Sequence, residues 1–291
     1  MKTQQKLPVT VCLPVLNEEK NLPSCLEALG DAFTEIVVVD SGSRDRTTDI
    51  ARSAGATVME FQWDGTFPKK RNWFLRTHNF KTPWVLFLDG DERVTPAFLS
   101  ELKVVLNSDS HSGYWISFTN WFMDKPLHHG DVFRKLALFR HEAGEYERFP
   151  EDSWSHLDME VHEHPVLGGS IGEIKSRLEH HDFRGFEHYI SKHNQYSTWE
   201  ANRWVWLQSA DRTSWDKLTD RQKFKYRYLD RLWLGYIYFA ASYVGKKGFL
   251  DGRAGLTFAL LKLRYFQDIR LKIKERLLSD ANLPKGPKQD A

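Results

Sequence analysis

The N-terminal third of the chain alternates between short apolar runs and segments whose apolar residues have helical spacing, and this alternation limits the possible fold. The predicted strands are residues 9–16, 35–40, 57–61 and 84–88, and the predicted helices are residues 21–29, 43–54, 68–80 and 95–106. Strands and helices that alternate at this spacing form a parallel sheet with right-handed crossovers. The sequence therefore predicts an α/β fold with a Rossmann-like, mostly parallel sheet flanked by helices.

The rest of the chain is predicted to contain further strands and then a mostly helical region. Residues 114–122 and 135–139 are predicted to form further strands, and from about Phe186 onward the pattern is mostly helical and aromatic. A chain of 291 residues with 41% hydrophobic content can bury one large core and a smaller appended region. We therefore expect an α/β domain over residues 1–215, a helical region over 216–280 and a disordered tail over 281–291.

Polar residues follow three of the predicted strands at the point where each strand ends. Asn17 and Glu18 follow the first strand, residues 40–43 end the second, and Asp89 and Asp91 follow the fourth. In open parallel sheets, ligands bind beyond the carboxyl ends of the strands. These side chains should therefore meet at one edge of the sheet.

The pair Asp89 and Asp91 comes directly after an apolar strand, so two carboxylates at a strand tip are in reach of one ion. Hard oxygen ligands suit Mg²⁺ or Mn²⁺, which also bridge diphosphates. The alternative is a surface turn, because Asp-x-Asp triplets are common on protein surfaces. The position after a strand favours the metal site.

Asp40 and the basic run from Lys69 to Arg71 are further binding candidates. Asp40 ends a buried strand, where an unpaired carboxylate is costly, and it could accept hydrogen bonds from a base or ribose. The alternative is that residues 40–43 cap the next helix, and both can hold. Lys70 and Arg71 would hold phosphate oxygens, or else belong to a solvated helix start.

Glu and His alternate at residues 160–164, and His180 and His181 follow. A zinc site is one interpretation, but the spacing is not the H-E-x-x-H of a helical metalloprotease site. The other interpretation is that a carboxylate here acts as the general base that takes a proton from an acceptor hydroxyl.

Charge and apolar content indicate what the protein binds and in which cellular compartment it lies. The formal net charge is +2, but residues 217–276 hold 15 Lys or Arg against 5 Asp or Glu. This basic region, with its aromatic residues at 232–244, indicates an anionic surface as partner, or else a solvated helical face. The two cysteines, Cys12 and Cys25, fit a reducing compartment. We recognise no secretory signal and no apolar run long enough to span a bilayer.

The motifs at residues 11–19, 35–43 and 86–92 resemble, in this order, those of family 2 glycosyltransferases of the GT-A fold. The resemblance covers roughly residues 8 to 200. Val161-His162-Glu163 and the spacing from His180 to Arg184 are similar to the bacterial lipopolysaccharide-core β-glucosyltransferase group. This resemblance implies an inverting enzyme that moves a sugar, by default glucose, from a UDP-sugar to a lipid-linked, lipopolysaccharide or exopolysaccharide acceptor.

The resemblance also implies residue roles. The nucleotide-sugar would be bound by Pro14, Asn17, Glu18, Asp40, Ser41 and Gly42, with Lys70, Arg71, Asp89 and Arg184 near the ribose and phosphates. Asp91 would be the principal ligand of Mg²⁺ or Mn²⁺, with Asp89 and His180 assisting. Glu163 would be the catalytic base, with Glu160 as the second choice. The chain lacks a clear Glu-Asp pair at the base position of the family.

Within this resemblance, residues 1–215 would be the catalytic domain and residues 216–280 a membrane-associating or acceptor region. We expect a cytoplasmic protein held peripherally on the inner face of a bacterial inner membrane. No RNA-binding signature is recognised, so nucleic acid is not expected as a partner.

Three other classes of protein would share part of this pattern. A non-catalytic nucleotide-sugar-binding protein would keep Asp40 and Asp89 without a base. A nucleotidyltransferase usually carries a glycine-rich phosphate loop after its first strand, but residues 14–18 contain no glycine. A phosphatase with a nucleophilic Asp would need its Asp-x-Asp after the first strand rather than the fourth.

Overall fold

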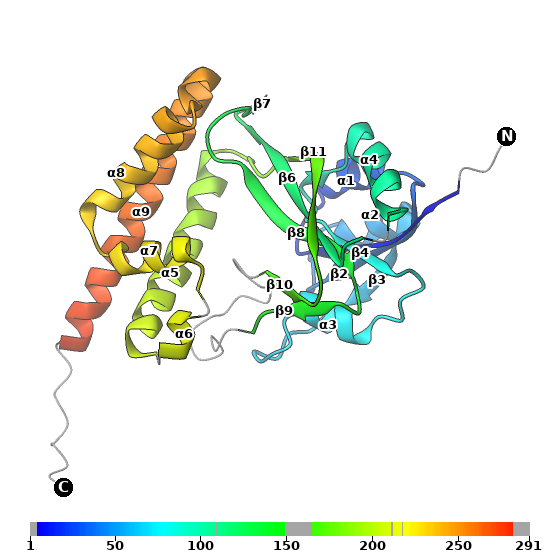
Figure 1. The fold of residues 1–291 in the computed structure, drawn as a ribbon, viewed down its shortest axis with the longest axis horizontal. Helices are drawn as coiled ribbons and strands as arrows, with labels where there is room; N and C mark the ends of the chain where they lie inside the picture. Colours follow the sequence, from blue (N-terminus) through cyan, green and yellow to red (C-terminus); the bar gives the residue numbers. More distant parts are fainter. Residues whose placement is uncertain (1–4, 109, 149–163, 211, 217, 282–291) are drawn as a thin grey trace, which may run out of the picture. The chain divides into compact units, whose positions relative to one another are not determined.

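The computed structural model describes residues 5–281 apart from 109, 149–163, 211 and 217. The chain divides into two compact units, Met1–Pro126 with Val132–Asp182, and Leu127–Asp131 with Phe183–Ala291. Figure 1 labels the helices and strands of both units.

The first unit is an α/β domain built on one large sheet. Its helices are α1 (Leu22–Leu29), α2 (Thr47–Ser53), α3 (Lys70–Thr77) and α4 (Pro96–Leu106). Its strands are β1 (Leu7–Val15), β2 (Phe33–Asp40), β3 (Thr57–Glu60), β4 (Trp84–Phe87), β5 (Glu92–Arg93), β6 (Gly113–Phe122), β7 (Lys125–Pro126), β8 (Phe133–Arg140), β9 (Gly144–Tyr146), β10 (Pro165–Leu167) and β11 (Ile171–His180).

The described residues form a nine-stranded sheet in the order β3-β2-β1-β4-β8-β6-β11-β5, with β7 paired to β6. β1 pairs in parallel with β2 and β4, and β2 pairs in parallel with β3. β8 runs antiparallel to both β4 and β6. The predicted α/β fold is confirmed, and its parallel half is the part that the strand–helix alternation covers.

The sheet is buried on both faces, which explains the nearly continuous apolar run of β1. Val9, Val11 and Leu13 pack in one cluster with α1 and α4 residues, whereas Cys12 packs with Val37 in a cluster on the other face. Both free cysteines are buried.

Two helix starts show how local hydrogen bonds set the element bounds. Thr95 caps α4, because its Oγ1 accepts a hydrogen bond from Phe98 N at 3.2 Å. The predicted helix from residue 43 instead begins at Thr47, so Ser43 is not its cap. Asp45 Oδ1 accepts from Thr47 N at 3.0 Å, and Ser43 belongs to the preceding loop.

The second unit is helical. It contains α5 (Phe186–Ser209), α6 (Arg212–Asp216), α7 (Asp220–Tyr228), α8 (Leu232–Ala240), the short π-helix η1 (Ala241–Gly245), the 3-10 helix η2 (Gly248–Asp251) and α9 (Gly252–Ala281). Trp204 on α5, Tyr226 on α7, Leu234 on α8 and Phe266 on α9 share one buried cluster. The division between the units therefore lies earlier than the boundary expected after residue 215, because α5 packs with α9.

The loop Leu127–Asp131 belongs to this helical unit through polar contacts. Asp131 Oδ1 lies 2.5 Å from Lys246 Nζ, and its Oδ2 is paired with Lys262. Burial opposes the charged form of Asp131, but Lys262 and Lys246 outweigh it and lower its pKa to about 2. The stability that this carboxylate supplies is therefore present above its ordinary pKa of 3.8 and is lost as pH falls toward 2.

Asp131→Asn should lower the free energy of unfolding at pH 7 by on the order of 2 kcal/mol, because two ammonium groups lose their counter-ion. The difference from the wild-type protein should stay constant down to about pH 4.5 and then shrink. Urea unfolding at several pH values measures it, with the exposed Asp216→Asn as the control. A pH-independent difference would contradict the assignment.

Candidate active site

The carboxyl ends of β2, β1 and β4 lie side by side at one edge of the sheet. Val15 at the end of β1 is paired with Asp40 at the end of β2, and Leu88 N after β4 donates to Cys12 O at 3.0 Å. A Cβ on Gly90 would lie 3.1 Å from Glu18 Cγ, so the loops after β1 and β4 also touch. The structure therefore brings together the three polar loops that the sequence analysis placed at one edge.

The loops after β1 and β2 hold each other through hydrogen bonds. Asn17 N donates to Ser43 Oγ at 2.8 Å, Arg44 N donates to Asn17 Oδ1 at 2.9 Å, and Glu18 N donates to Thr47 Oγ1 at 2.8 Å. Asn17 has a positive φ of 55°, which lets the chain turn directly after the strand. These bonds fix the shape of the edge before any ligand binds.

Asp40 is buried and shapes its own loop. Its Oδ2 accepts hydrogen bonds from Gly42 N and Ser43 N, both at 2.9 Å, and Ser43 Oγ donates to its Oδ1. A hollow of about 280 Å³ lies beside it, lined by Asp40, Gly42, Ser43, Thr48, Arg52, Glu60, Phe61 and Gln62. Asp40 thus combines the structural role weighed above with a position at a pocket.

Pro14 and Ser41 lie next to this loop. Pro14 is buried in β1 opposite Val39. Ser41 N donates to Val15 O at 3.2 Å, and its buried Oγ makes no hydrogen bond with the described residues. Pro14 therefore supports the edge from inside the sheet.

Asp89 is held by two cations. Arg71 Nη2 lies 3.1 Å from Asp89 Oδ1, and Lys135 of β8 is paired with Asp89 Oδ2. Burial alone would raise the pKa of Asp89, but Lys135 and Arg71 hold it well below its usual range. Asp89 is therefore an anion whose two oxygens are already engaged.

Glu92 completes this ionic group. Its Oε1 lies 2.5 Å from Lys135 Nζ, and its Oε2 accepts a hydrogen bond from Asp89 N at 3.0 Å. The side chain has no exposed surface, and this burial raises the pKa of Glu92 while Lys135 lowers it part of the way back. Lys135 thus links the two carboxylates that flank Gly90 and Asp91.

Asp91, Glu92 and His180 form a candidate metal site, because their ligand atoms lie within 4.8 Å of one another. Asp91 Oδ1 is buried, lies 3.7 Å from His180 Nε2 and makes no hydrogen bond in the described part of the chain. His180 Nδ1 lies 3.0 Å from Asn120 Oδ1, which orients the ring. Two carboxylates and one imidazole suit a divalent cation.

The residues that follow β3 and begin α3 make contacts with different parts of the site. Lys70 is fully buried and its Nζ donates to Val15 O at 3.1 Å, so it supports the end of β1. Arg71 reaches Asp89, and its guanidinium carbon lies 5.3 Å from the centre of the Tyr146 ring. Asn72 makes two hydrogen bonds to the backbone of Tyr146, at 2.8 and 2.9 Å. The first turn of α3 thereby joins Tyr146 at the end of β9 to Asp89.

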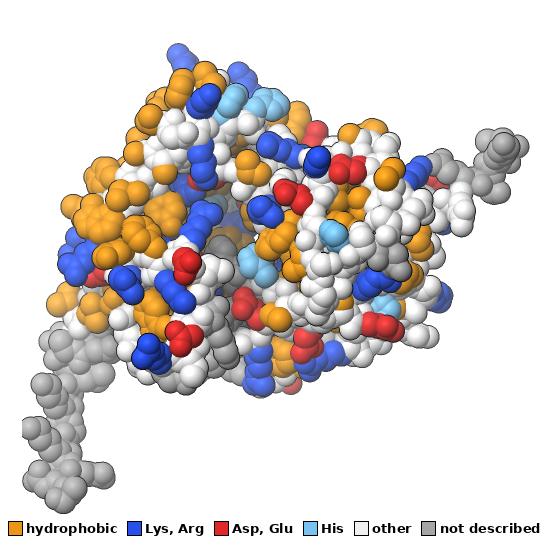
Figure 2. Space-filling view, viewed as in Figure 1, with side chains coloured by type: hydrophobic (Ala, Val, Ile, Leu, Met, Phe, Trp, Pro, Cys, Tyr) orange, Lys and Arg blue, Asp and Glu red, His pale blue; other side chains and the backbone are white. Residues whose placement is uncertain are grey.

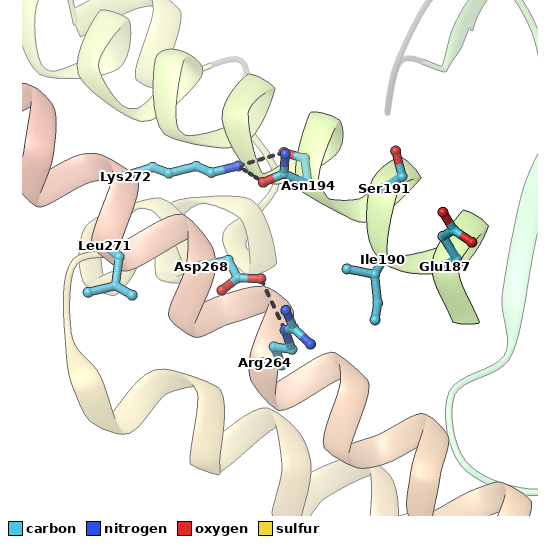
Figure 3. Close-up of a pocket in the computed structure, with 8 residues that line it drawn as sticks. All are labelled: Glu187, Ile190, Ser191, Asn194, Arg264, Asp268, Leu271 and Lys272. Atoms are coloured by element: carbon cyan, nitrogen blue, oxygen red, sulfur yellow. Dashed lines mark hydrogen bonds and ion pairs between the residues drawn. The ribbon is translucent and has the colours of Figure 1, made fainter. Parts of the chain in front are cut away.

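Three predicted site residues do not belong to the described part of the first unit. Glu160 and Glu163, and with them the zinc interpretation of residues 160–164, lie outside the described residues. Arg184 belongs to the second unit. A groove of about 590 Å³ in that unit is lined by Glu187, Ile190, Ser191, Asn194, Arg264, Asp268, Leu271 and Lys272, and none of the predicted site residues lines it (Figure 3).

The sequence analysis missed Lys135 and Asn120. Glu92 is the last residue of the acidic run 89–92, which the sequence predicts to hold the metal ion. Lys135 directly precedes the buried apolar run of β8, where a half-buried lysine is most stable with a charged partner. Asn120 carries no such signal, since only the register of β11 against β6 pairs it with His180.

The fold and this strand edge define a glycosyltransferase of the GT-A type. Residues 10–152 match the family model described as "Glycosyl transferase family 2". These residues, just under half of the chain, therefore form a family 2 glycosyltransferase domain.

Two similar proteins align with this chain over most of its length. The chain is 29% identical over 272 residues to the lipopolysaccharide core biosynthesis glycosyltransferase LpsC of Rhizobium meliloti, an alignment that covers 88% of this chain and 90% of that protein. An uncharacterised glycosyltransferase of Rickettsia typhi is 22% identical over 274 residues, covering 91% and 88% of the two chains.

Among solved structures, glucosyl-3-phosphoglycerate synthase from Mycobacterium tuberculosis, in complex with Mn²⁺, UDP and glucosyl-3-phosphoglycerate, is 25% identical. The match covers 38% of this chain and 43% of that chain, with a TM-score of 0.30. This chain thus spans less than half the length of that enzyme.

Proposed function

We propose that this chain transfers a sugar, by default glucose, from a UDP-sugar to a lipid-linked or lipopolysaccharide glycan, with inversion at the anomeric carbon. The observation that carries the proposal is the shared strand edge, where the Asp40 loop and the Asp89–Asp91 loop both contact the loop after β1. Similarity to LpsC along most of the chain supports an acceptor of the lipopolysaccharide type.

Asp91 and His180, with Glu92, are the residues that would hold Mg²⁺ or Mn²⁺. The buried Asp91 Oδ1 without a hydrogen bond among the described residues is the observation that fits such an ion. A bound divalent cation neutralises the diphosphate and improves it as a leaving group. Asn120 keeps the second nitrogen of His180 turned toward Asp91.

The remaining residues would bind and orient the donor. The hollow beside Asp40 and Gly42 offers hydrogen-bonding groups to a nucleoside, while Arg71 places a positive charge next to Asp89 where ribose and phosphate are expected. Asn17 and Glu18 hold the loops that form this surface. Arg184 remains a predicted phosphate contact, and Glu163, with Glu160 in reserve, the predicted base.

The alternative function is a nucleotide-sugar-binding protein without catalysis. Turnover separates the two: purified protein incubated with Mn²⁺ and a panel of UDP-sugars should release UDP, faster when a truncated lipopolysaccharide acceptor is present. Donor binding in a thermal-shift assay without UDP release or transfer would favour the binding protein. A nucleotidyltransferase would instead form pyrophosphate from UTP and a sugar phosphate.

We also propose that the helical unit attaches the enzyme to an anionic membrane surface. None of its described helices has the length and hydropathy needed to cross a bilayer. Its large apolar side chains are nevertheless exposed along α8, η1, η2 and the start of α9, namely Leu232, Trp233, Tyr236, Ile237, Val244, Phe249, Leu250, Leu256 and Leu260. Figure 2 shows hydrophobic and basic side chains together on this unit.

Basic residues accompany this apolar face. Lys246, Lys247 and Arg253 are exposed between and beside the apolar positions. Apolar side chains that enter the headgroup region, with cations that contact anionic lipid, are the two components of interfacial binding. The rival explanation is that these helices serve only to pack within the protein.

The double variant Ile237→Asp/Leu250→Asp should weaken binding to anionic vesicles by at least about tenfold, because both exposed side chains would carry charge into the interface. Vesicle co-sedimentation at low and high salt measures this, with Val104→Asp on α4 as the control, since Val104 is 70% exposed. Unchanged binding by the double variant would support the packing role. Point variants are preferable to truncation after residue 214, which would remove the helices that cover Trp204 and Leu207.

A further inference from the structure

Lys135 is the described cation that contacts both Asp89 and Glu92. Its Nζ lies 2.5 Å from Glu92 Oε1 and is also paired with Asp89. The same ammonium group lies 5.2 and 5.5 Å from the ring centres of Phe133 and Phe118. The lysine is therefore held in an aromatic setting with its charge directed at two carboxylates.

The charges at this place are close to balanced without a metal ion. Asp89, Asp91 and Glu92 bring three carboxylates within four residues, and Lys135 and Arg71 face Asp89 and Glu92. Burying carboxylates without such partners is strongly unfavourable. Asp91 is the member of the trio whose buried Oδ1 makes no hydrogen bond among the described residues.

Glu92 is shared between two possible cations. It belongs to the group with Asp91 and His180 that suits a divalent ion, and its Oε1 is in contact with Lys135. A positive ammonium group this close repels a second cation and competes with it for the charge of the same carboxylate. The contacts of Lys135 therefore bear directly on how tightly the site can hold a metal ion.

We propose that Lys135 is a positioning residue that acts as an internal counter-ion: it fixes Asp89 and Glu92 and keeps metal affinity low until the donor diphosphate binds. The inference rests on the proposed metal role of Asp91 and His180. Mg²⁺ and Mn²⁺ sites of this kind commonly take ligands from both carboxylates and substrate phosphates. Metal ion and donor should accordingly bind with positive coupling. Lys135 neutralises carboxylate charge that would otherwise attract the metal ion, and the donor phosphates supply negative charge and oxygen ligands in its place.

The test is a Mn²⁺ titration without nucleotide, followed by electron paramagnetic resonance, on wild-type protein and Lys135→Met. The variant should bind Mn²⁺ at least about tenfold more tightly, and UDP should then improve Mn²⁺ affinity less than it does in the wild type. Lys135→Arg should resemble the wild type, and so should Lys103→Met, which removes an exposed lysine from α4. Equal or weaker Mn²⁺ binding by Lys135→Met overturns the inference.

Thermal unfolding is a second test, which can be used even if Lys135→Met is too unstable for the Mn²⁺ titration. Without metal, Lys135→Met should lower Tm by roughly 5–10 °C, and Lys135→Met/Asp89→Asn should recover part of the loss because one carboxylate has been neutralised. No recovery in the double variant overturns the counter-ion role. Wild-type protein that turns over donor without any divalent ion would overturn the proposed metal function instead, while the stability comparison still decides the role of Lys135.

Discussion

Replacing Asp91 by asparagine is expected to lower kcat/KM with the preferred UDP-sugar by roughly a thousandfold or more. The substitution keeps the shape of the side chain and removes one negative charge from the group formed with Glu92 and His180. Asp91 Oδ1 makes no hydrogen bond with the described residues, so no such bond is lost. Tm without metal should therefore stay within about 2 °C of the wild-type value, or rise.

The measurement has two parts. Steady-state transfer assays across a Mn²⁺ series give the loss of activity, and thermal shifts with Mn²⁺ should show that the variant has lost the stabilisation seen in the wild type. Asp31→Asn, which neutralises an exposed Asp of the same unit, should change neither quantity. Near-normal activity of Asp91→Asn with the same Mn²⁺ dependence would remove Asp91 from the metal site.

Glu163→Gln should give the second large effect, a fall in kcat of about 10² to 10⁴ with donor affinity retained, as expected when a general base is lost. Glu163 lies in the sequence between β9 and β10, which pair with each other, and Arg71 and Asn72 contact Tyr146 at the end of β9. Arg71 in turn contacts Asp89.

Glu160→Gln is the matched comparison, because it makes the same chemical change three residues earlier. If Glu163 is the base, Glu160→Gln should retain most of its activity, and only Glu163→Gln should lose the acidic limb of the kcat profile against pH. The reverse pattern would move the base to Glu160. Normal turnover by both variants would exclude this segment as the source of the base.

The parallel half of the fold follows from sequence because its signals are local. An apolar run such as β1, a β-branched run such as β2 and a capping Thr95 each act within a few residues. The pairing of β8 between β4 and β6, and of β11 beside β6, joins residues far apart in the chain. Such pairing depends on side-chain packing across the sheet, which a single sequence does not display.

The same distinction applies to the site. Asp40, Asp89 and Asp91 could be placed at one edge because each follows a strand of the alternating part. The ion pair between Asp89 and Lys135 could not be predicted. Lys135 comes from a distant segment of the chain, and only the antiparallel pairing of β8 with β4 brings it to Asp89. Asp89 was predicted to assist the metal ion, whereas in the structure both its oxygens face basic side chains.

The loop from Leu127 to Asp131 has a consequence for how such a protein can arise and be divided. It lies within the sequence of the α/β unit but is held by helical-unit residues: Gly130 N donates to Lys246 O at 2.9 Å and His129 N donates to Asp251 Oδ2 at 2.9 Å. A gene fragment ending at residue 182 would leave buried Leu127 and charged Asp131 without these neighbours. Recombination that exchanged the helical part alone would need a matching change inside the first part, so the two are expected to be inherited as one module.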